Sequence, residues 1–368
     1  MIDDDRRLRV ALVTNMPVPY RVSTWERLAA QPGLRLTLVF CTPREHDRGW
    51  PVPEPAVDHV TLPGLALRHR GRSIHLNPGV SGVLRRLRPQ VLVTTGFNPT
   101  HLLAIVQGLM RGVAHVAQTD GTLLSESALG PLHRAVRRAV FRRTAAFVGA
   151  GEGSLALYRS YGVPEDRLFR SPLCVDNAAY APRPDDRRDL DLLFSGRLVG
   201  PKNPLFALQV AQAVARRLGR RVSLGVAGAG PLEPALRQAA AAAPEVDVHP
   251  AGFVPPSALP AWYRRGRVFL FPTAWDTWGV VVNEACAAGL PVIATPQAGA
   301  SGDLVLDGHT GRVLPLGVEA WADTAAAWLA DPATLNQLGE RARERVQAWN
   351  ADAACAGLAQ AIRRAASG

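Results

Sequence analysis

Short apolar runs alternate with longer helical segments along this chain, and this alternation limits its fold more than any other feature. In the first half, apolar runs of strand length occupy residues 8–14, 36–41, 91–94, 113–117 and 145–149. Strands that alternate with helices of about 10–15 residues indicate a parallel, doubly wound sheet. The first half is therefore expected to form one Rossmann-like α/β domain.

The same pattern starts again after a charged segment that contains prolines. Further apolar runs occupy residues 190–194, 222–227, 246–248, 268–271 and 291–294, with helices expected at 205–218 and 232–243. We expect an N-terminal domain over 1–178, a linker over 179–190 and a second Rossmann-like domain over 191–348. Residues 349–368 would form an apolar-basic helix that could pack back on the N-terminal domain. Ligands are expected at the carboxyl ends of the strands, in a cleft between the two domains.

Composition excludes several classes of protein. The chain is 47% hydrophobic, which favours filled cores over disorder, and no apolar run reaches 18 residues, the minimum for a membrane-spanning helix. The first seven residues are acidic and polar, unlike a signal peptide. The four cysteines lack the spacing of a metal site and are expected to be reduced thiols. These features predict a cytoplasmic protein.

The charge is strongly basic, at +11, yet Lys202 is the single lysine among 42 basic residues. A basic surface can attract nucleic acid, an anionic membrane or a phosphorylated substrate. No zinc-finger spacing or aromatic-basic RNA motif is present, so nucleic acid is not an expected partner. Arginines recur at helical spacing over residues 133–143. They form either a solvated helix face or a peripheral contact of the N-terminal domain with the inner membrane surface.

The segment 276–292 places two carboxylates, Asp276 and Glu284, eight residues apart. An apolar run precedes them, and Gly279 marks the start of a helix that carries Glu284 on its second turn. The first amides of a helix favour an anion. Two hydrogen-bond acceptors on either side of an anion-binding site could bind a sugar hydroxyl on one side and a nucleoside hydroxyl on the other. Packing of a helix on a sheet would explain the apolar residues but not the two carboxylates.

A glycine turn with two cations follows the first strand of the second half. Gly196 precedes Arg197, Lys202 lies five residues further on, and Pro204 stands near the first position of the next helix. A guanidinium and an ammonium on such a loop could bind a diphosphate, the arginine in a bidentate manner and the lysine as a point charge. The alternative is an exposed basic loop.

Three further features of the second half have both a functional and a structural interpretation. Gly228 and Gly230 form another strand-to-helix turn, which either passes close to a ligand or only shapes the backbone. The segment ending at Val254 could cover a flat base. Asp189 and Asp191 have the Asp-x-Asp form of a metal site, but they lie where the linker enters a strand, so no metal is expected.

Together, these motifs resemble the family 4 retaining glycosyltransferases of the GT-B fold over residues 191–315. The segment 276–284 is similar to the family's Glu-x7-Glu motif, with Asp276 at the first position and Glu284 at the second. The resemblance implies two Rossmann-like, doubly wound domains facing a central cleft. It also implies that Glu284 holds the ribose of the donor nucleotide and that Asp276 holds the donor sugar. The remaining donor-side residues that it implies are Arg197 and Lys202 at the diphosphate, and Trp278, Gly279, Val280, Gly196, Gly228, Gly230 and Val254 around the donor.

The N-terminal half is less similar to that family. Many members carry a Gly-Gly loop after the first strand, where this chain has the loop 15–21 with Tyr20 and Arg21. A histidine often stands where this chain has Asp120. We therefore take Asp120 as a candidate catalytic residue, in addition to Arg197, Lys202 and Asp276. Tyr20, Arg21 and Asn98 are candidates for the acceptor side.

The resemblance implies a hexosyltransferase that needs no metal or cofactor and retains the anomeric configuration. Its partners would be a nucleotide-diphosphate-sugar donor and a hydroxyl on a glycan, a lipid-linked acceptor or a small natural product. Two alternatives stay open: a phosphorylase or epimerase of the GT-B fold, and a non-catalytic binder of membrane surfaces or nucleic acid. A pyridoxal-dependent phosphorylase would need a Schiff-base lysine, and Lys202 is the only lysine available.

Overall fold

The structure is a computed structural model that describes residues 7–45, 52, 54–69 and 72–368. The chain divides into two compact units. Unit 1 comprises Met1–Leu173 and Ala351–Gly368, and unit 2 comprises Cys174–Asn350. The acidic segment that argues against a signal peptide falls mainly on residues 1–6, outside the described residues.

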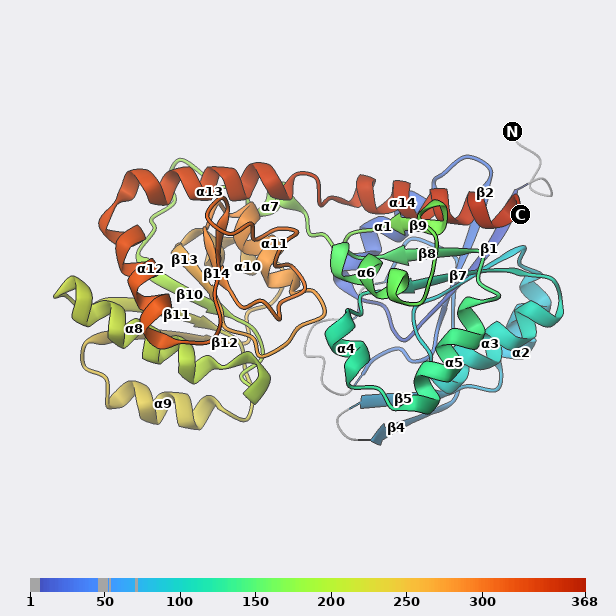
Figure 1. The fold of residues 1–368 in the computed structure, drawn as a ribbon, viewed down its shortest axis with the longest axis horizontal. Helices are drawn as coiled ribbons and strands as arrows, with labels where there is room; N and C mark the ends of the chain where they lie inside the picture. Colours follow the sequence, from blue (N-terminus) through green and yellow to red (C-terminus); the bar gives the residue numbers. More distant parts are fainter. Residues whose placement is uncertain (1–6, 46–51, 53, 70–71) are drawn as a thin grey trace. The chain divides into compact units, whose positions relative to one another are not determined.

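Unit 1 is built on a parallel sheet with the strand order β3-β2-β1-β6-β7-β8-β9 (Figure 1). Its strands are β1 (Leu8–Thr14), β2 (Leu34–Phe40), β3 (His59–Thr61), β6 (Val91–Thr94), β7 (Ala114–Thr119), β8 (Ala146–Gly149) and β9 (Leu168–Arg170). The five strands expected from the sequence are confirmed, with ends shifted by at most two residues. The two edge strands, β3 and β9, were not expected because three residues are too few to show a period.

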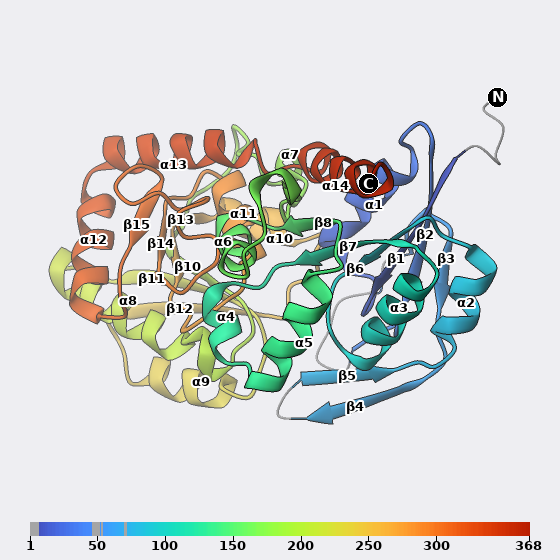
Figure 2. The same ribbon diagram turned by 45° about the vertical axis from the view of Figure 1, so that its right-hand side comes forward.

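Both faces of this sheet are covered by helices. Along β1, Val10 and Leu12 belong to one buried cluster while Ala11 and Val13 belong to another, as the two-residue period of a strand requires. Figures 1 and 2 show α2 and α3 side by side. The helices of unit 1 are α1 (Pro19–Ala29), α2 (Val80–Leu87), α3 (Pro99–Met110), α4 (Leu123–Ser127), α5 (Pro131–Phe141), α6 (Glu152–Ser160), the 3-10 turn η2 (Glu165–Arg167) and α14 (Ala351–Ala366).

The last helix, α14, completes the core of unit 1. Its residues Leu358 and Ile362 are fully buried in the cluster that also holds Val10 and Leu12. Gly357 lies so close to β9 that an added Cβ would fall 1.7 Å from the carbonyl oxygen of Arg170. The hydroxyl of Ser171 donates to a carbonyl oxygen of α14 at 2.8 Å. The helix is therefore an integral layer of unit 1.

An antiparallel hairpin, β4 (Leu65–His69) and β5 (Arg72–Leu76), stands outside the main sheet of unit 1. The sequence analysis expected no strands there. Leu65, Leu67 and Leu76 are exposed, so the apolar residues of the hairpin do not form a buried face. The apolar pattern of a half-buried strand is therefore not a guide to this hairpin.

Unit 2 repeats the architecture, with the parallel strand order β12-β11-β10-β13-β14-β15. Its strands are β10 (Leu190–Ser195), β11 (Val222–Ala227), β12 (Val246–Gly252), β13 (Gly266–Phe271), β14 (Val292–Ala294) and β15 (Gly311–Val313). Its helices are α7 (Asn177–Tyr180), the 3-10 turn η3 (Gly200–Lys202), α8 (Pro204–Leu218), α9 (Glu233–Ala241), α10 (Leu259–Arg264), α11 (Val280–Ala287), α12 (Val318–Ala330) and α13 (Pro332–Val346). All strands expected from the sequence in this half are confirmed; only β15 was missed.

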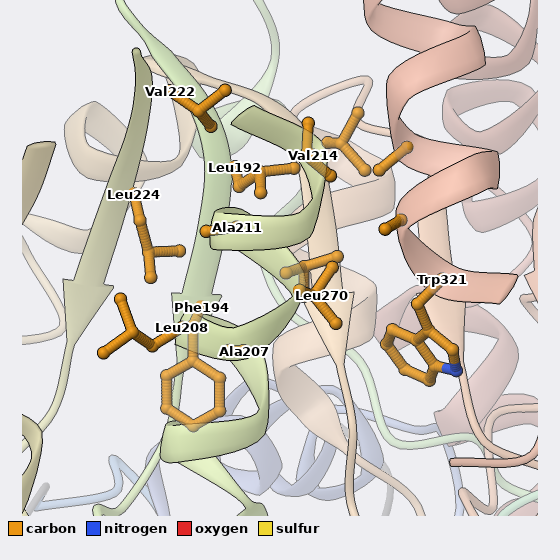
Figure 3. Close-up of a cluster of buried hydrophobic side chains, with 14 of the residues drawn as sticks. Leu192, Phe194, Ala207, Leu208, Ala211, Val214, Val222, Leu224, Leu270 and Trp321 are labelled. Carbon is orange, nitrogen blue, oxygen red and sulfur yellow. The ribbon is translucent and has the colours of Figure 1, made fainter. Parts of the chain in front are cut away.

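The main core of unit 2 lies between its sheet, α8 and α12 (Figure 3). Leu192, Phe194 and Leu270 project from the sheet into this layer. Trp321 of α12 is fully buried; its ring lies 5.3 Å from that of Phe206, and its Nε1 donates to the Pro315 carbonyl oxygen at 2.9 Å. Burial of each large apolar side chain contributes about 1.5–3 kcal/mol, so this layer fixes the sheet that carries the loops described below.

The charged segment 179–190 is held by contacts within unit 2. Arg188 donates to the carbonyl oxygen of Ala288 at 3.0 Å, and Asn177, just before the segment, donates to that of Val346 at 3.0 Å. Asp186 accepts from Arg264 at 3.1 Å. The division between the units falls at Leu173 and Cys174, before this segment, whereas the sequence analysis ends the first domain at residue 178.

Candidate active site

The sheet of unit 2 has a topological switch point between β10 and β13. From β10 the chain continues to β11 and β12 on one side, and from β13 it continues to β14 and β15 on the other. The loops after β10 and β13 therefore diverge at the carboxyl edge of the sheet, where open α/β sheets bind ligands. These two loops carry the cations and the first carboxylate singled out in the sequence.

The two loops meet in an ion pair between Lys202 and Asp276. The ammonium Nζ contacts Oδ2 of Asp276 and lies 5.6 Å from the ring centre of Phe271. Both side chains of the pair are partly buried. Asn203, in the left-handed conformation at φ 51°, donates to the Pro272 carbonyl oxygen at 2.8 Å and so holds the loops together. Arg197 lies on the same loop as Lys202.

The turn into α11 is fixed by Asp276 and Gly279. Oδ1 of Asp276 accepts from the backbone N–H of Trp278 at 3.2 Å. The indole of Trp278 is buried and donates to Oδ1 of Asn283 at 2.8 Å, so this side chain packs inside unit 2. Gly279 has φ +98°, and an added Cβ would lie 2.7 Å from the Phe271 ring. Val280 then begins the helix, whose first N–H groups lack partners within it.

Glu284 lies on the second turn of α11, almost fully buried among two tyrosines. The Tyr180 hydroxyl donates to its Oε1 at 3.1 Å. Among the described residues, neither its Oε2 nor the hydroxyl of buried Tyr263 has a hydrogen-bond partner within standard geometry. Burial raises the pKa of Glu284 to about 7, although the nearby Tyr263 and Tyr180 hydroxyls lower it in part. An unsatisfied carboxylate oxygen at this depth is costly unless a donor group reaches it.

The predicted donor glycines have a clear packing role. Gly228 has φ +144°, and an added Cβ would lie 1.8 Å from the Gly196 carbonyl oxygen. At Gly230 the corresponding distance to the Leu198 carbonyl oxygen is 2.5 Å. Gly196 itself has φ +152° and open space beside it. Two strand-to-helix turns thus pack backbone against backbone, which explains Gly228 and Gly230 without a ligand.

A small pocket of about 130 Å³ lies beside these turns. Leu198, Val248, Pro250 and Gly252 contribute to its lining, and Glu233 stands at its border. Val254 follows β12 by two residues, is half-buried and does not line the pocket. The base-contacting role implied for Val254 stays a prediction.

Asp189 and Asp191 each form a two-point contact with an arginine. Arg265 donates to Asp189 at 2.9 and 2.6 Å, and Arg220 donates to Asp191 at 2.8 and 3.0 Å. Both carboxylates therefore anchor the start of β10. Within the part of the chain that the structure describes, no group of three histidine, cysteine or acidic residues could hold a metal ion.

Unit 1 has its own switch point, between β1 and β6, and a pocket of about 180 Å³ lies there. Tyr20, Arg21 and Asp120 all contribute to its lining. Arg21 donates to Oδ1 of Asp120 at 2.8 Å. Asn98, the fourth candidate of this half, caps α3 by accepting from the His101 N–H at 3.2 Å and donates to Asn15 at 2.9 Å. Asn98 is not one of the lining residues, but it contacts Asn15, which lines the pocket.

The arginines expected on one helix face lie on α5 and just after it, and several have partners within unit 1. Arg137 pairs with Glu126 and lies 4.8 Å from the Phe97 ring centre, while Arg134 donates to the Ser127 carbonyl oxygen at 3.0 Å. The most exposed apolar side chain of this helix is Leu132, at 75%. None of the helices in the described ranges is long and apolar enough to cross a bilayer.

The tyrosines around Glu284 are the main residues that the sequence analysis missed. Tyr180 lies within the segment expected to be a linker, 104 residues before its carboxylate partner. Tyr263 lies on the short helix α10. Neither carries a local signal, because their proximity to Glu284 depends on how α7 and α10 pack against α11.

The fold and site can now be compared with known proteins. The chain has a GT-B fold: the crystal structure of Anabaena Alr3699/HepE in complex with UDP and glucose matches it with a TM-score of 0.74 at 13% identity, covering 97% of this chain and 100% of that one. The model of the family "Glycosyl transferases group 1" matches residues 181–345.

Several relatives carry the name D-inositol 3-phosphate glycosyltransferase. The protein of Xylanimonas cellulosilytica is 31% identical over 376 residues, which is 91% of this chain and 84% of that protein. The protein of Pseudarthrobacter chlorophenolicus is 33% identical over 216 residues; that match covers 54% of this chain and about half, 51%, of the relative. This chain belongs to the group 1 glycosyl transferases.

Proposed function

We propose that this protein transfers a sugar from a nucleotide-diphosphate sugar to an acceptor hydroxyl and retains the anomeric configuration. The observation that carries the proposal is the pairing of Lys202 with Asp276 at the switch point of unit 2, beside the first turn of α11. A cation, a carboxylate and free helix amides together suit a sugar diphosphate. The family membership and the names of the relatives support the same reaction class.

The donor diphosphate would compete with Asp276 for the Lys202 ammonium. Once Lys202 binds a phosphate oxygen, Asp276 is released to accept a hydrogen bond from a sugar hydroxyl. Arg197 would bind the same diphosphate, and Glu284 would accept hydrogen bonds from the ribose through its unsatisfied oxygen. The mainly apolar pocket lined in part by Gly228 and Val248 is a candidate binding site for the base of the donor nucleotide.

In the proposed reaction, the bond between the anomeric carbon and the phosphate oxygen breaks while a bond to the acceptor oxygen forms on the same face. The acceptor proton passes to the leaving phosphate. Lys202, Arg197 and the amides of α11 stabilise the charge that accumulates on the diphosphate, so no metal is required. The acceptor would bind in the unit 1 pocket lined by Tyr20, Arg21 and Asp120.

We further propose that the protein is cytoplasmic and that unit 1 contacts the inner membrane surface. The supporting observation is the exposure of Leu123, Leu124 and Leu132 on α4 and α5, with Arg138 and Arg142 also exposed nearby. Exposed leucines beside arginines suit an anionic lipid surface.

A thermal-shift screen of nucleotide sugars in the presence of EDTA tests the proposed reaction. A donor at about 100 times its Kd should add roughly 2.7 kcal/mol to the free energy of unfolding, which is a clear rise in Tm. The best donor should then support transfer at the same rate with and without EDTA. No response to any nucleotide sugar would contradict the donor proposal, and loss of turnover that manganese or magnesium restores would contradict the metal-free mechanism.

A further inference from the structure

The unit 1 pocket has a size and position that suit a single polar ring. It lies where the chain leaves β1, β6 and β7, and Thr14, Thr95 and Thr119 contribute to its lining. Its volume of about 180 Å³ is below the roughly 300–1,000 Å³ of pockets that enclose drug-sized ligands. Hydroxyl and amide side chains can both donate to and accept from the hydroxyls of such a ring.

Among the described residues that line this pocket, negatively charged side chains outnumber positively charged ones. Arg21 is the one cation among these described residues. It is already paired with Asp120 at 2.8 Å, and its side chain is only 9% exposed. The remaining lining charge is the carboxylate of Glu45. Oε1 of Glu45 accepts from the Asn15 amide at 3.3 Å and lies 3.1 Å from Nε2 of His75. One guanidinium and two carboxylates leave the described lining residues with one net negative charge.

A second observation points to a ligand in the same place. Nη1 of Arg21 is buried and has no hydrogen-bond partner among the described residues. Buried guanidinium nitrogens are normally satisfied, so this unpaired donor of a lining residue suits a ligand oxygen. The neighbouring His101 adds no positive charge, because burial lowers its pKa to about 4.

We propose that this pocket binds an acceptor whose ring bears hydroxyls and an ammonium group, and that it disfavours a phosphorylated one. Glu45 would pair with the ammonium, and Nη1 of Arg21 would donate to a ring oxygen. A phosphate would face two carboxylates, and among the described lining residues the one guanidinium already has Asp120 as its counter-ion. This substrate class rests on the proposed transferase function and goes beyond it, because the name D-inositol 3-phosphate glycosyltransferase, which several relatives carry, points instead to a phosphorylated cyclitol.

Three matched sugars test the proposal: glucosamine, glucose and glucose 6-phosphate. Their dissociation constants for the full-length protein can be measured by ligand-observed NMR with a saturating nucleoside diphosphate. Glucosamine should bind at least tenfold more tightly than glucose, and glucose 6-phosphate at least tenfold more weakly. In Glu45→Gln the advantage of glucosamine should fall to about twofold or less while glucose affinity is kept, because the amide can still accept from Asn15.

Glu340→Gln is the matched control, because Glu340 is exposed on α13 of unit 2 and lines neither pocket. It should leave all three constants unchanged. Binding of glucose 6-phosphate as tight as that of glucose, a preference that survives in Glu45→Gln, or no binding of any of the three sugars would each overturn the proposal. Titrations with the nucleoside diphosphate in the same samples distinguish the proposed function from the proposed acceptor class. If the nucleoside diphosphate does not bind, the donor site is contradicted. If it binds but the three sugars bind in another order, only the acceptor class is contradicted.

Discussion

The ammonium of Lys202 forms an ion pair with the carboxylate of Asp276, 74 residues further along the chain. Each partner is held by its own loop, and the two loops leave neighbouring strands of one parallel sheet. The pair is partly buried, so its attraction is less screened than that of a surface pair. A bound diphosphate can replace the carboxylate without leaving the ammonium unpaired, which makes Lys202 the residue to test first.

Lys202→Ala should lower kcat/KM for the donor by about one to two orders of magnitude, because a charge-assisted hydrogen bond to the diphosphate contributes roughly 1.5–3 kcal/mol. Lys202→Arg should recover activity only in part, since a planar guanidinium does not replace a compact ammonium. Steady-state kinetics with circular dichroism make the measurement. Arg221→Ala, at an exposed arginine of the same unit, is the control. Kinetics of Lys202→Ala equal to this control would remove Lys202 from the proposed site.

Glu284→Gln should weaken donor binding by about 1–3 kcal/mol, because one carboxylate oxygen that accepts from ribose becomes an amide donor. Calorimetric titration with the best nucleoside diphosphate makes the comparison. Glu340→Gln, at an exposed residue of α13, should bind as the wild type does. Equal affinity in all three proteins would contradict the ribose contact.

The stability of the protein should reflect the raised pKa of Glu284. Its pKa rises from 4.5 to about 7 on folding, so the folded protein holds this proton more tightly than the unfolded chain does. The stabilisation is complete below pH 4.5 and is lost as pH rises to about 7. Relative to Glu284→Gln, the wild type should therefore lose about 2–3 kcal/mol of unfolding free energy between pH 5 and pH 8. Urea unfolding at both pH values measures this difference, and parallel curves for the two proteins would show that Glu284 is not the titrating group.

Gly228→Ala should destabilise unit 2 by about 3 kcal/mol or more, because its Cβ would overlap the Gly196 carbonyl oxygen at a positive φ. Gly219→Ala is a matched control: it also has a positive φ, +61°, but open space around it, and should cost about 1–2 kcal/mol. Urea unfolding of both variants gives the comparison. Similar costs at the two sites would mean that the turn after β11 adapts to a side chain.

Leu132→Asp should reduce binding to vesicles that contain anionic lipid, since it places a negative charge at an exposed apolar position of α5. Vesicle co-sedimentation gives the bound fraction, which should fall at least threefold. Leu316→Asp, at an exposed leucine of unit 2, should leave it unchanged. Absence of vesicle binding in the wild type would end the membrane proposal.

The sequence predicted what depends on local pattern. The longer strands of both sheets followed from apolar runs with helices between them, and the turn at Gly279 followed from a glycine between a strand and a helix. The contact between Lys202 and Asp276 could not be predicted, because it depends on β10 and β13 being neighbours in the sheet. The same limit applies to Tyr180 and Glu284.

At two other places the residue type alone did not decide between a functional and a structural role. For Gly228 and Gly230 the sequence left two interpretations open, a close approach to a ligand or a role in the backbone turn, and in the structure their nearest neighbours are backbone atoms of the preceding turn. The arginines of α5 were expected to form one exposed basic face, but Arg137 is half-buried against Glu126. In both cases the residue type was informative about the local conformation or charge, and only the packing identified the partner.

The position of α14 in the core of unit 1 has a consequence for biosynthesis. Residues up to Leu173 leave the ribosome without the helix that covers one face of their sheet, and all of unit 2 is made before that helix appears. At usual rates of translation this interval is on the order of ten seconds or more. During that time the face of the sheet that bears Val10 and Leu12 lacks the helix that helps to bury it, whereas unit 2 is continuous in the chain and can fold first.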